Sequence, residues 1–525
     1  MFNKSIDGRL VLPRPSAAVC NGNTYDVNAC TVATTKWFDP VWRSDQIGAM
    51  QHHQWENSSC SISINSMKCN QGAVPVVAVN ATLPEHVQAT IRFAAKYNLR
   101  LVIKNTGHDY LGRSTAAGSL LLWLHYMKNM TMIKQYTSCT SENVTNAARL
   151  YAGVQWGEAY QRLDKLNLTA IGGVSATVGA VGGFLQGGGH GPLTRWKGLA
   201  VDQVLEYDVI TANGQRLTAN ACENSDLFWA LKGAGGGTFA VVISAVLRTF
   251  PTPYIVAVTG TVSAPNETRF AEITTNFIRA LPSLADAGWS GYFSFSNLEL
   301  AVLFNIPNGN LNEVNDTWMR FLTDNSDLRV PYMNITVFPS FYQYSTIVLN
   351  QYPYGGYNVL YSSRLISESV VRNEPDKVAE VFMQMKANST AYSGFAAFLV
   401  AGGQVSNISG INSSVNPAWR TALLHVVYSQ GWLDTMSEVE KNELAMQVSD
   451  RGEILNRLAF NSQINSYANE ADPNEPNWQE RFYGSKQIYN QLKLIKDTFD
   501  PDGLFICKNC IGSDDWTTDL NCPKT

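Results

Sequence analysis

A single histidine lies within a polar, glycine-flanked stretch at residues 104–114, KNTGHDYLGRS, in a chain that has 7 histidines in 525 residues. The stretch follows LRLVI, an apolar run that predicts a strand. An imidazole at the end of a strand, here His108, can ligate a metal, act as a base, anchor a cofactor covalently or bond within its own loop. The neighbouring carboxylate is Asp109, and neither adjacent segment supplies a second histidine, so no metal site is predicted here.

A second unusual stretch spans residues 172–194 and reads GGVSATVGAVGGFLQGGGHGPLT. Glycine lets backbone N–H groups turn toward a ligand and lets the ligand approach without a Cβ clash. Apolar residues are interleaved with these glycines, namely Val178, Val181, Phe184 and Leu185, whereas a flexible linker lacks them. The composition therefore favours a cradle for a pyrophosphate or a flat ring system.

Two common nucleotide-binding motifs do not fit this stretch. No GKS or GKT follows it, as a Walker loop requires. No helix opens directly on a G-x-G-x-x-G with an acidic residue about 20 positions later. A nucleotide bound here would therefore not be held in the Rossmann way.

Length and charge limit the class of protein. A chain of 525 residues is too long for one ordinary core, so at least two domains are expected. The net charge of −4 and the lack of a basic run argue against nucleic-acid binding. No window of about 18 uncharged apolar residues appears, so no membrane span is predicted.

The cysteines and glycosylation sequons favour export. Several of the 9 cysteines cluster near the termini at spacings that allow local loops. The start, MFNKSIDGRL, lacks the apolar core of a secretory signal, so an exported protein would have lost its signal from this numbering. We predict a secreted, disulfide-bonded glycoprotein in which at least one thiol is unpaired. The sequons are Asn57, Asn80, Asn129, Asn143, Asn167, Asn266, Asn315, Asn334, Asn388, Asn407 and Asn412.

The pair Cys507 and Cys510, in CKNC, has the spacing of a redox or zinc half-site. No second CxxC exists to complete a zinc cluster. Cys522 lies nearby and offers a disulfide partner, so a structural disulfide is the preferred interpretation.

The elements expected to position these stretches alternate between helix and strand. Residues 84–98 and 153–167 have the apolar spacing of amphipathic helices. Residues 205–215 predict a strand that runs into an Asn-Gly turn. Residues 224–247 predict a helix capped by Asn224 or Ser225, a glycine stop and then a buried strand.

The rest of the chain divides around these elements. Residues 1–70 are expected to be loop-rich and pinned by disulfides. After Pro251 and Pro253, β-rich runs mix with helices to about residue 455, which predicts an α+β domain with an antiparallel sheet. A last helix is closed by Asp500-Pro501.

Four motifs, in order, carry a resemblance to a known family. They are KNTGHDYLGRS, TVGAVGGFLQGGGHGPLTRWKGLAVDQVLEYDVITANG, NSDLFWALKGAGGGTFAVV and NWQERFYGS…DPDGLF. Together they resemble the vanillyl-alcohol-oxidase type of FAD-linked oxidoreductase, in its berberine-bridge-enzyme-like, secreted fungal form. The resemblance implies an α+β fold. A two-part FAD-binding domain of the vanillyl-alcohol-oxidase/PCMH type, 1–252 and 456–525, would carry an inserted α+β substrate domain, 253–455, built on an antiparallel sheet.

The resemblance also implies how FAD is held. His108 would be bonded through a ring nitrogen to the flavin 8α-carbon, since a neutral imidazole is a good nucleophile. The residues around it would wrap the pyrophosphate with backbone donors. The cofactor contacts implied besides His108 are Lys104, Asn105, Thr106, Gly107, Asp109, Gly112, Arg113, Ser114, Gly173, Val174, Thr177, Gly179, Gly182, Gly183, Gly187, Gly188, Gly189, Gly191, Leu193, Val241, Val242, Tyr467 and Asn469.

Many members of the family have a second covalent link, from a cysteine just before TVG. Here residues 174–176, VSA, stand in that place, and no cysteine lies between Cys139 and Cys222. We therefore predict one covalent bond to FAD, through His108.

Three candidates for substrate chemistry lie in separate parts of the sequence. In similar enzymes a tyrosine at the place of Tyr110 points at the active site, although it could also pack within its loop. His190 lies in GGG-x-G, where relatives often carry an aromatic residue, and could face the substrate or cap the loop. His425 shares a strand face with Leu423 and Val427. It is the preferred base, with a satisfied buried histidine as the alternative.

Two further candidates lie in YANEAD, residues 467–472, which matches the segment beneath the flavin in the family. Asn469 would bond the edge of the ring. Tyr467 or Glu470 could replace His425 as the base. The family has a tyrosine where Glu470 stands, so roles of that tyrosine do not carry over.

The predicted function is that of a secreted FAD-dependent oxidase. It would move a hydride from an alcohol, sugar or secondary-metabolite C–H to FAD and then reduce oxygen to hydrogen peroxide. A small-molecule substrate and molecular oxygen are the expected partners of a monomer that binds neither nucleic acid nor membrane. The alternatives are a dehydrogenase with another acceptor and a low-turnover flavin-carrying binding protein. A glycosidase would need a carboxylate pair in a cleft and would leave the glycine-rich motifs unexplained.

Overall fold

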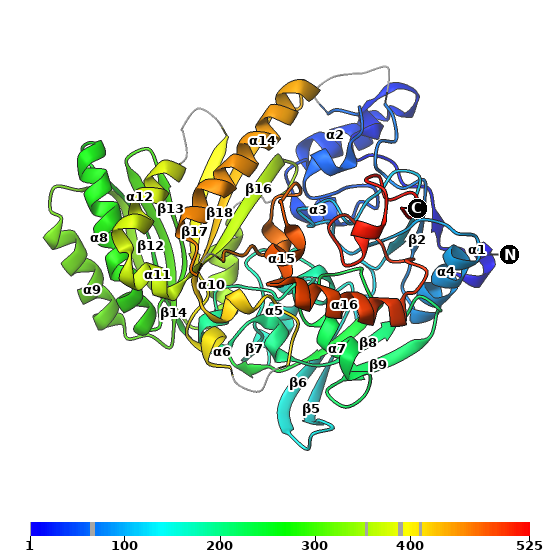
Figure 1. The fold of residues 1–525 in the computed structure, drawn as a ribbon, viewed down its shortest axis with the longest axis horizontal. Coiled ribbons are helices and arrows are strands. Elements are labelled where there is room, and N and C mark those ends of the chain that lie inside the picture. The colour runs from blue at the N-terminus through cyan, green and yellow to red at the C-terminus, as the bar shows by residue number, and fades with distance from the viewer. Residues whose placement is uncertain are drawn as a thin grey trace.

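The computed structural model describes residues 2–62, 69–351, 355–386, 392–408, 412–461 and 463–524. Two halves lie side by side (Figure 1). The middle of the chain, around the labels α8 to α14, forms one half, and the N-terminal and C-terminal segments together form the other. Within the described residues, no helix is both long and apolar enough to cross a membrane.

The first sheet positions the histidine stretch. Its order is β1-β2-β4-β3, with β2, β4 and β3 parallel and β1 antiparallel. The helix predicted at residues 84–98 is confirmed as α4 (Pro84–Lys96), which buries Val87 and Ile91. Because β3 ends at Lys104, His108 lies in the loop that directly follows this strand. The strands are β1 (Leu10–Val11), β2 (Val77–Asn80), β3 (Leu101–Lys104) and β4 (Leu120–Trp123).

The second sheet is antiparallel, in the order β5-β6-β10-β8-β9. Its central strand β10 is buried at every residue, as its mainly apolar run predicts. The predicted hairpin turn joins β8 to β9, with Gly214 at φ +77°. The elements are β5 (Met130–Thr137), β6 (Asn143–Tyr151), α5 (Trp156–Asp164), β8 (Val204–Ile210), β9 (Arg216–Asn220), α7 (Ser225–Leu231) and β10 (Val241–Leu247).

The predicted cap of α7 is corrected in one respect. Asn224 occupies the N-cap position, but in the left-handed region, at φ 49°, and its side chain makes no cap bond. Its Nδ2 donates instead to the Thr218 carbonyl at 2.7 Å. The side chain therefore fastens α7 to β9.

The C-terminal segment packs on this N-terminal half. Tyr483 of α15 (Trp478–Tyr483) and Leu492 of α16 (Lys486–Phe499) join the core that contains the second sheet. The predicted helix end is confirmed, since Asp500 caps α16 and its carboxylate accepts from the Leu504 and Phe505 N–H groups.

The middle of the chain builds an antiparallel sheet of seven described strands, in the order β15-β12-β14-β13-β17-β18-β16. Helices cover one face and share its core (Figure 1). The strands are β12 (Ile255–Ser263), β13 (Ser290–Ser296), β14 (Glu299–Pro307), β15 (Arg329–Phe338), β16 (Asn358–Ser367), β17 (Ser393–Leu399) and β18 (Ala422–Trp432). The helices are α8 (Glu267–Asp286), α9 (Leu311–Asp324), α11 (Glu368–Asn373), α12 (Pro375–Met385) and α14 (Glu438–Leu455).

The opposite face of this sheet carries a row of side chains. Register pairs Leu303 with Tyr292, Tyr292 with Phe398 and Phe398 with His425, so these four residues cross β14, β13, β17 and β18 in line. Because side chains alternate along a strand, neighbours such as Phe293 point into the helix-covered core instead. The α+β class with an antiparallel sheet is confirmed, and the domain boundaries at residues 252 and 455 stay a prediction.

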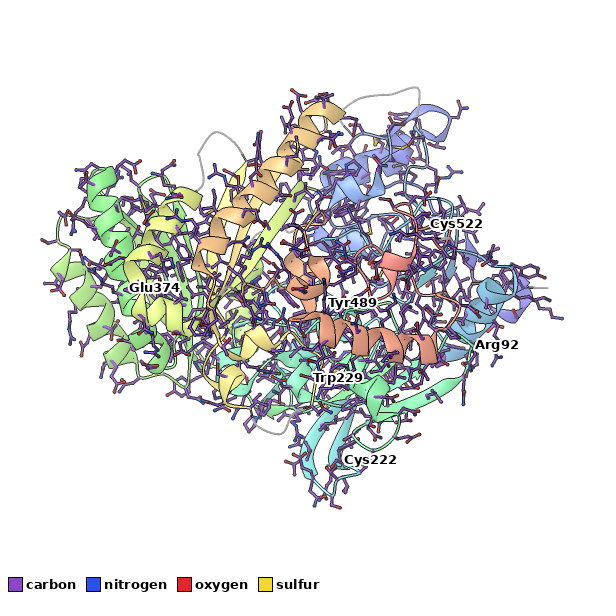
Figure 2. All side chains as sticks on the ribbon, viewed as in Figure 1. Arg92, Cys222, Trp229, Glu374, Tyr489 and Cys522 are labelled. Carbon is purple, nitrogen blue, oxygen red and sulfur yellow. A yellow bond between two sulfur atoms is a disulfide. The ribbon has the colours of Figure 1, made fainter. Side chains whose placement is uncertain are left out.

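Disulfides hold eight of the nine cysteines. They are Cys20–Cys30, Cys60–Cys69, Cys139–Cys222 and Cys507–Cys510. Cys522 is exposed and free, near the end of the chain (Figure 2). The predicted unpaired thiol is confirmed. The suggestion that Cys522 pairs with the CKNC cysteines is wrong, because those two bond to each other. The sequon Asn388 lies outside the described residues.

Candidate active site

A cavity of about 490 Å³ is enclosed by segments from both halves of the molecule. The loop after β3, the glycine-rich stretch, the start of β10 and the turn at Ala468–Glu470 form most of its wall. The sequence predicted the lining residues Asn105, Thr106, Gly107, His108, Asp109, Tyr110, Arg113, Ser114, Gly173, Val174, Gly179, Gly182, Gly183, His190, Val241, Val242, Tyr467, Asn469 and Glu470.

The His108 ring is neutral and fixed at one nitrogen. Its Nε2 lies 2.8 Å from Thr177 Oγ1. Burial, reinforced by the nearby His52 ring, lowers the pKa of His108 to about 3. No partner of Nδ1 is found among the described residues. The ring therefore offers an unprotonated, uncharged nitrogen at the cavity wall.

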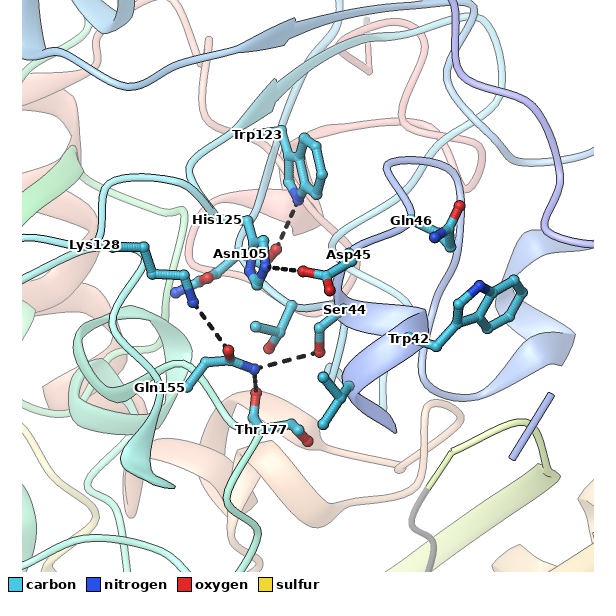
Figure 3. A network of polar contacts seen from close by, with 12 residues as sticks. Trp42, Ser44, Asp45, Gln46, Asn105, Trp123, His125, Lys128, Gln155 and Thr177 are labelled. Atoms are coloured by element: carbon cyan, nitrogen blue, oxygen red, sulfur yellow. Dashed lines mark hydrogen bonds and ion pairs between the residues drawn. The ribbon is translucent and has the colours of Figure 1, made fainter. Parts of the chain in front are cut away.

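Further hydrogen bonds hold the backbone of Thr177 and of Asn105, which precedes His108 in the loop (Figure 3). Gln155 Nε2 donates to the Thr177 carbonyl at 2.9 Å and lies 3.5 Å from Ser44 Oγ. Trp123 Nε1 donates to the Asn105 carbonyl at 2.9 Å. These bonds fix the backbone on either side of the His108–Thr177 pair.

Two glycines leave room along the cavity. A Cβ built on Gly182 or Gly183 meets nothing within 4 Å, although both residues line the wall. Gly179 is different, because a Cβ there would lie 2.2 Å from Asn105 Nδ2. A methyl group on Gly182 or Gly183 would thus occupy space that a ligand can fill.

Buried polar atoms at the wall lack partners. Asn105 Oδ1 and Gln186 Oε1 are buried and accept no hydrogen bond from the described residues. Burying such acceptors unpaired is costly. A flat ligand that carries N–H or O–H donors would satisfy them, and this fits the space left by the glycines.

The cavity wall is tied to the C-terminal segment. Arg113 pairs with Asp109 at 2.9 Å and donates to Asn469 Oδ1 at 3.1 Å. Asn469 Nδ2 in turn donates to the Gly183 carbonyl at 2.9 Å and to the Tyr467 hydroxyl at 2.9 Å. The loop after β3, the glycine-rich stretch and the C-terminal segment therefore form one hydrogen-bonded frame.

Three titratable side chains meet at one end of the site. Glu470 Oε1 lies 3.1 Å from His190 Nε2, and Glu470 Oε2 lies 2.8 Å from His425 Nε2. Burial lowers the pKa of His425 despite its bond to Glu470. Burial alone would raise the pKa of Glu470, but the two imidazole contacts hold it below its ordinary value. Burial raises the pKa of the Tyr467 phenol, which keeps its proton.

These groups differ in their access to the cavity. The Glu470 side chain is 23% exposed and the His190 side chain 8%, and both residues line the wall. The His425 side chain is 0% exposed and does not line it. His425 is packed against Phe398, Trp419 and Tyr467 instead.

Tyr110 lines the cavity beside an aromatic group. Its ring lies 4.6 Å from His52 and 4.4 Å from Tyr361 of β16, measured between centroids. The tyrosine thus packs between the two halves while it borders the cavity.

Several predicted contacts support the wall without lining it. Lys104 Nζ donates to the Ile47 and Ala49 carbonyls at 2.6 and 2.8 Å, and burial lowers its pKa to about 7. A Cβ on Gly112 would lie 2.4 Å from the Trp55 ring, so this glycine serves packing. The predicted residues outside the lining are Lys104, Gly112, Thr177, Gly187, Gly188, Gly189, Gly191, Leu193 and His425.

Sequence reasoning missed part of the wall. Gly236 and Gly237 belong to a GAGGG run that had been interpreted as a helix stop, so their glycine content was an available signal. Tyr292, Leu303 and Phe398 carried no local signal, because strand register alone brings them together.

Comparison with known proteins identifies the ligand that the glycine-lined cavity fits. An FAD binding domain model matches residues 75–220, and a berberine and berberine like model matches residues 466–512. An uncharacterized FAD-linked oxidoreductase of Arthroderma benhamiae is 37% identical, over 98% of this chain and 91% of its own length. A VAO-type flavoprotein oxidase of Thermothelomyces thermophilus is 34% identical, over 99% of this chain and 91% of its own.

A solved structure agrees with these relatives. The crystal structure of a VAO-type flavoprotein from Myceliophthora thermophila C1 superposes with a TM-score of 0.92 at 32% identity, covering 100% of this chain and 96% of that one. The open glycines and the orphaned acceptors of the cavity fit FAD. The chain therefore belongs to the FAD-linked oxidoreductases of the VAO type, with a berberine-like C-terminal segment.

Proposed function

We propose that this protein oxidises a small molecule through a C–H bond beside a hydroxyl, with FAD attached through His108 alone and molecular oxygen as the electron acceptor. Bound FAD supplies hydride uptake and the later transfer of two electrons. The observation that carries the proposal is the placement of the neutral His108 ring and the Glu470 carboxylate on the wall of one glycine-lined cavity.

The wall supports a single covalent link. Residues 174–176 supply no thiol to the cavity. Cys507 is the one cysteine among the described residues that line the cavity. Its sulfur is bonded to Cys510 and is therefore not a free thiol. His108 is held at Nε2 by Thr177, so Nδ1 is the nitrogen left to form the bond.

The substrate end combines polar groups with aromatic and aliphatic side chains. The cavity is lined by Tyr292, Leu303 and Phe398, which belong to the row of side chains that ends at His425. Aromatic faces suit the apolar side of a ring, whether of a sugar or a secondary metabolite. Glu470 and His190 supply the partners for a hydroxyl group.

Export and the oxygen acceptor belong to the same proposal. Four disulfides and the many sequons are typical of a secreted protein. The name of the Thermothelomyces relative, an oxidase, favours oxygen over another acceptor.

The function is tested by mixing the holoprotein anaerobically with a panel of alcohols, saccharides and aromatic alcohols. We expect at least one compound to bleach the flavin absorbance, and subsequent air to restore it with release of one peroxide per flavin. Bleaching followed by slow reoxidation in air would indicate a dehydrogenase. No bleaching across the panel would favour a binding protein.

Replacing Thr177 with valine should slow covalent attachment of FAD. The change keeps the shape but removes the hydroxyl bonded to His108 Nε2, a loss of about 1 kcal/mol, or roughly a fivefold slower reaction. Apoprotein is reconstituted with FAD, and acid-stable flavin is measured over time. Thr177→Ser, which keeps the hydroxyl, should restore the rate. An unchanged rate in the valine variant would show that Thr177 does not position the ring.

A further inference from the structure

We propose that Glu470 is the group that meets the substrate hydroxyl, and that Glu470, His190 and His425 accept its proton as one unit. The inference rests on the proposed function and assigns the proton acceptor within it. The substrate class that follows is a primary or secondary alcohol. Its O–H proton goes to the three-residue unit, its C–H hydride to FAD, and the product is the carbonyl compound.

Access to the cavity selects Glu470. It is the most exposed member of the unit, at 23%, and it lines the wall. His425 is fully buried, and its Nε2 is directed at Glu470. His190 Nε2 is likewise engaged by Glu470, while its Nδ1 is buried without a described partner. A hydroxyl that enters the cavity can therefore meet the carboxylate before either free ring nitrogen.

Charge gives the unit a reason to take a proton. The ion pairs described for Glu470 are those with the two histidines, and neither Lys nor Arg among the described residues forms one with it. The Glu470 carboxylate is bonded to the two imidazoles, and the His190 ring lies against Phe398, Trp419 and Tyr467. Burial alone disfavours a negative charge in such surroundings, and a proton taken up by the unit neutralises that charge.

The proton then belongs to the unit rather than to a single residue. Hydrogen-bonded groups this close titrate together, with apparent pKa values of the set. The carboxylate meets the proton first. Because the pKa of Glu470 is held below its ordinary value, the imidazoles on both sides share the proton until it is lost to solvent after the product leaves. His190 and His425 are thus positioning residues, because they act through Glu470.

Other titratable groups around the cavity do not compete for this role. Asp109 and Arg113 pair with each other. Burial keeps His108 neutral and Tyr467 protonated. The titratable or charged groups that face the unit or line the same cavity are His108, Asp109, Tyr110, Arg113, Tyr292 and Tyr467.

The test compares Glu470→Gln, Glu470→Asp and the matched control Glu206→Gln in the holoprotein, with a substrate from the panel. Glu206 is half-buried, pairs with Arg149 and lies outside the cavity lining. Wild-type flavin reduction should rise with pH and level off, because the unit must be unprotonated to act. Glu470→Gln should reduce flavin roughly 100-fold more slowly or worse, without this pH dependence. Glu470→Asp should keep the pH dependence at an intermediate rate, and Glu206→Gln should match wild type.

A second measurement, of Tm against pH, tests the charge of Glu470 without substrate turnover. The folded-state pKa of Glu470 is lowered, so its stabilising effect is present above the unfolded value and is lost as the pH falls. The Tm gap between wild type and Glu470→Gln should therefore be widest near neutrality and close in acid. A Tm difference that does not change with pH would contradict the claim that Glu470 is ionised in the folded protein.

Two results would overturn the proposal that the three residues accept the proton. One is a Glu470→Gln variant that reduces flavin as fast as wild type. The other is a stoichiometric divalent metal that a chelator removes together with activity, since the donor atoms of the three side chains lie within 4.8 Å of one another and would then be ligands. If no alcohol reduces wild-type flavin, the proposed function fails, while the Tm comparison still decides the charge of Glu470.

Discussion

Replacing His108 with alanine should give a protein from which acid releases all of the flavin. In the wild type, the proposed bond from His108 to FAD survives unfolding, so the acid precipitate stays yellow. The variant keeps the glycines and the frame built by Arg113 and Asn469. It should therefore still bind FAD, but without a covalent tether. The measurement is the division of flavin absorbance between precipitate and supernatant.

The control for this experiment is His86→Ala. His86 is a buried histidine of α4 that bonds Asp7 and lies outside the cavity lining. Its replacement should leave the precipitate yellow. Peptide mapping of the wild type should place the flavin on the peptide that contains His108. A yellow precipitate from His108→Ala would mean that another side chain forms the bond.

Part of this site could be predicted because its signals are local. The strand that ends at Lys104 and the glycine density of residues 172–194 each lie within one short segment. His108, Gly182 and Gly183, which the sequence predicts as FAD contacts, all line the cavity, and their contact with FAD stays a prediction. The antiparallel sheet was predicted for the same reason, from β-rich runs between residues 253 and 455.

The substrate end could not be predicted in the same way. Tyr292 and Phe398 are neighbours because β13 pairs with β17, across about a hundred residues of sequence. His425 was favoured as the base from strand alternation, which gives the face of a side chain but not what covers it. Glu470 contacts the His425 ring from a segment that follows the last strand of the sheet in the chain. Long-range packing thus decided which titratable group reaches the cavity.

Gly183 lies in the glycine-rich stretch and lines the cavity, so a substitution there tests whether FAD lies against this stretch. Replacing Gly183 with leucine should strongly weaken FAD binding without destabilising the apoprotein. A Cβ at this position meets no atom of the other described residues within 4 Å, so the side chain has room in the cavity. The same side chain fills the space that the flavin needs. We expect affinity for FAD to fall by at least about a hundredfold, equivalent to about 3 kcal/mol.

The measurement is flavin per protein after reconstitution of the apoprotein, beside its Tm without FAD. Gly183→Ala is the matched control, because one methyl group takes up little of the cavity and should leave most binding intact. Gly179 gives the opposite behaviour. A Cβ there would lie 2.2 Å from Asn105 Nδ2, so Gly179→Ala should lower the apoprotein Tm itself. If Gly183→Leu binds FAD normally, the flavin does not lie against this stretch. If it unfolds the apoprotein, the space beside Gly183 belongs to the packed core.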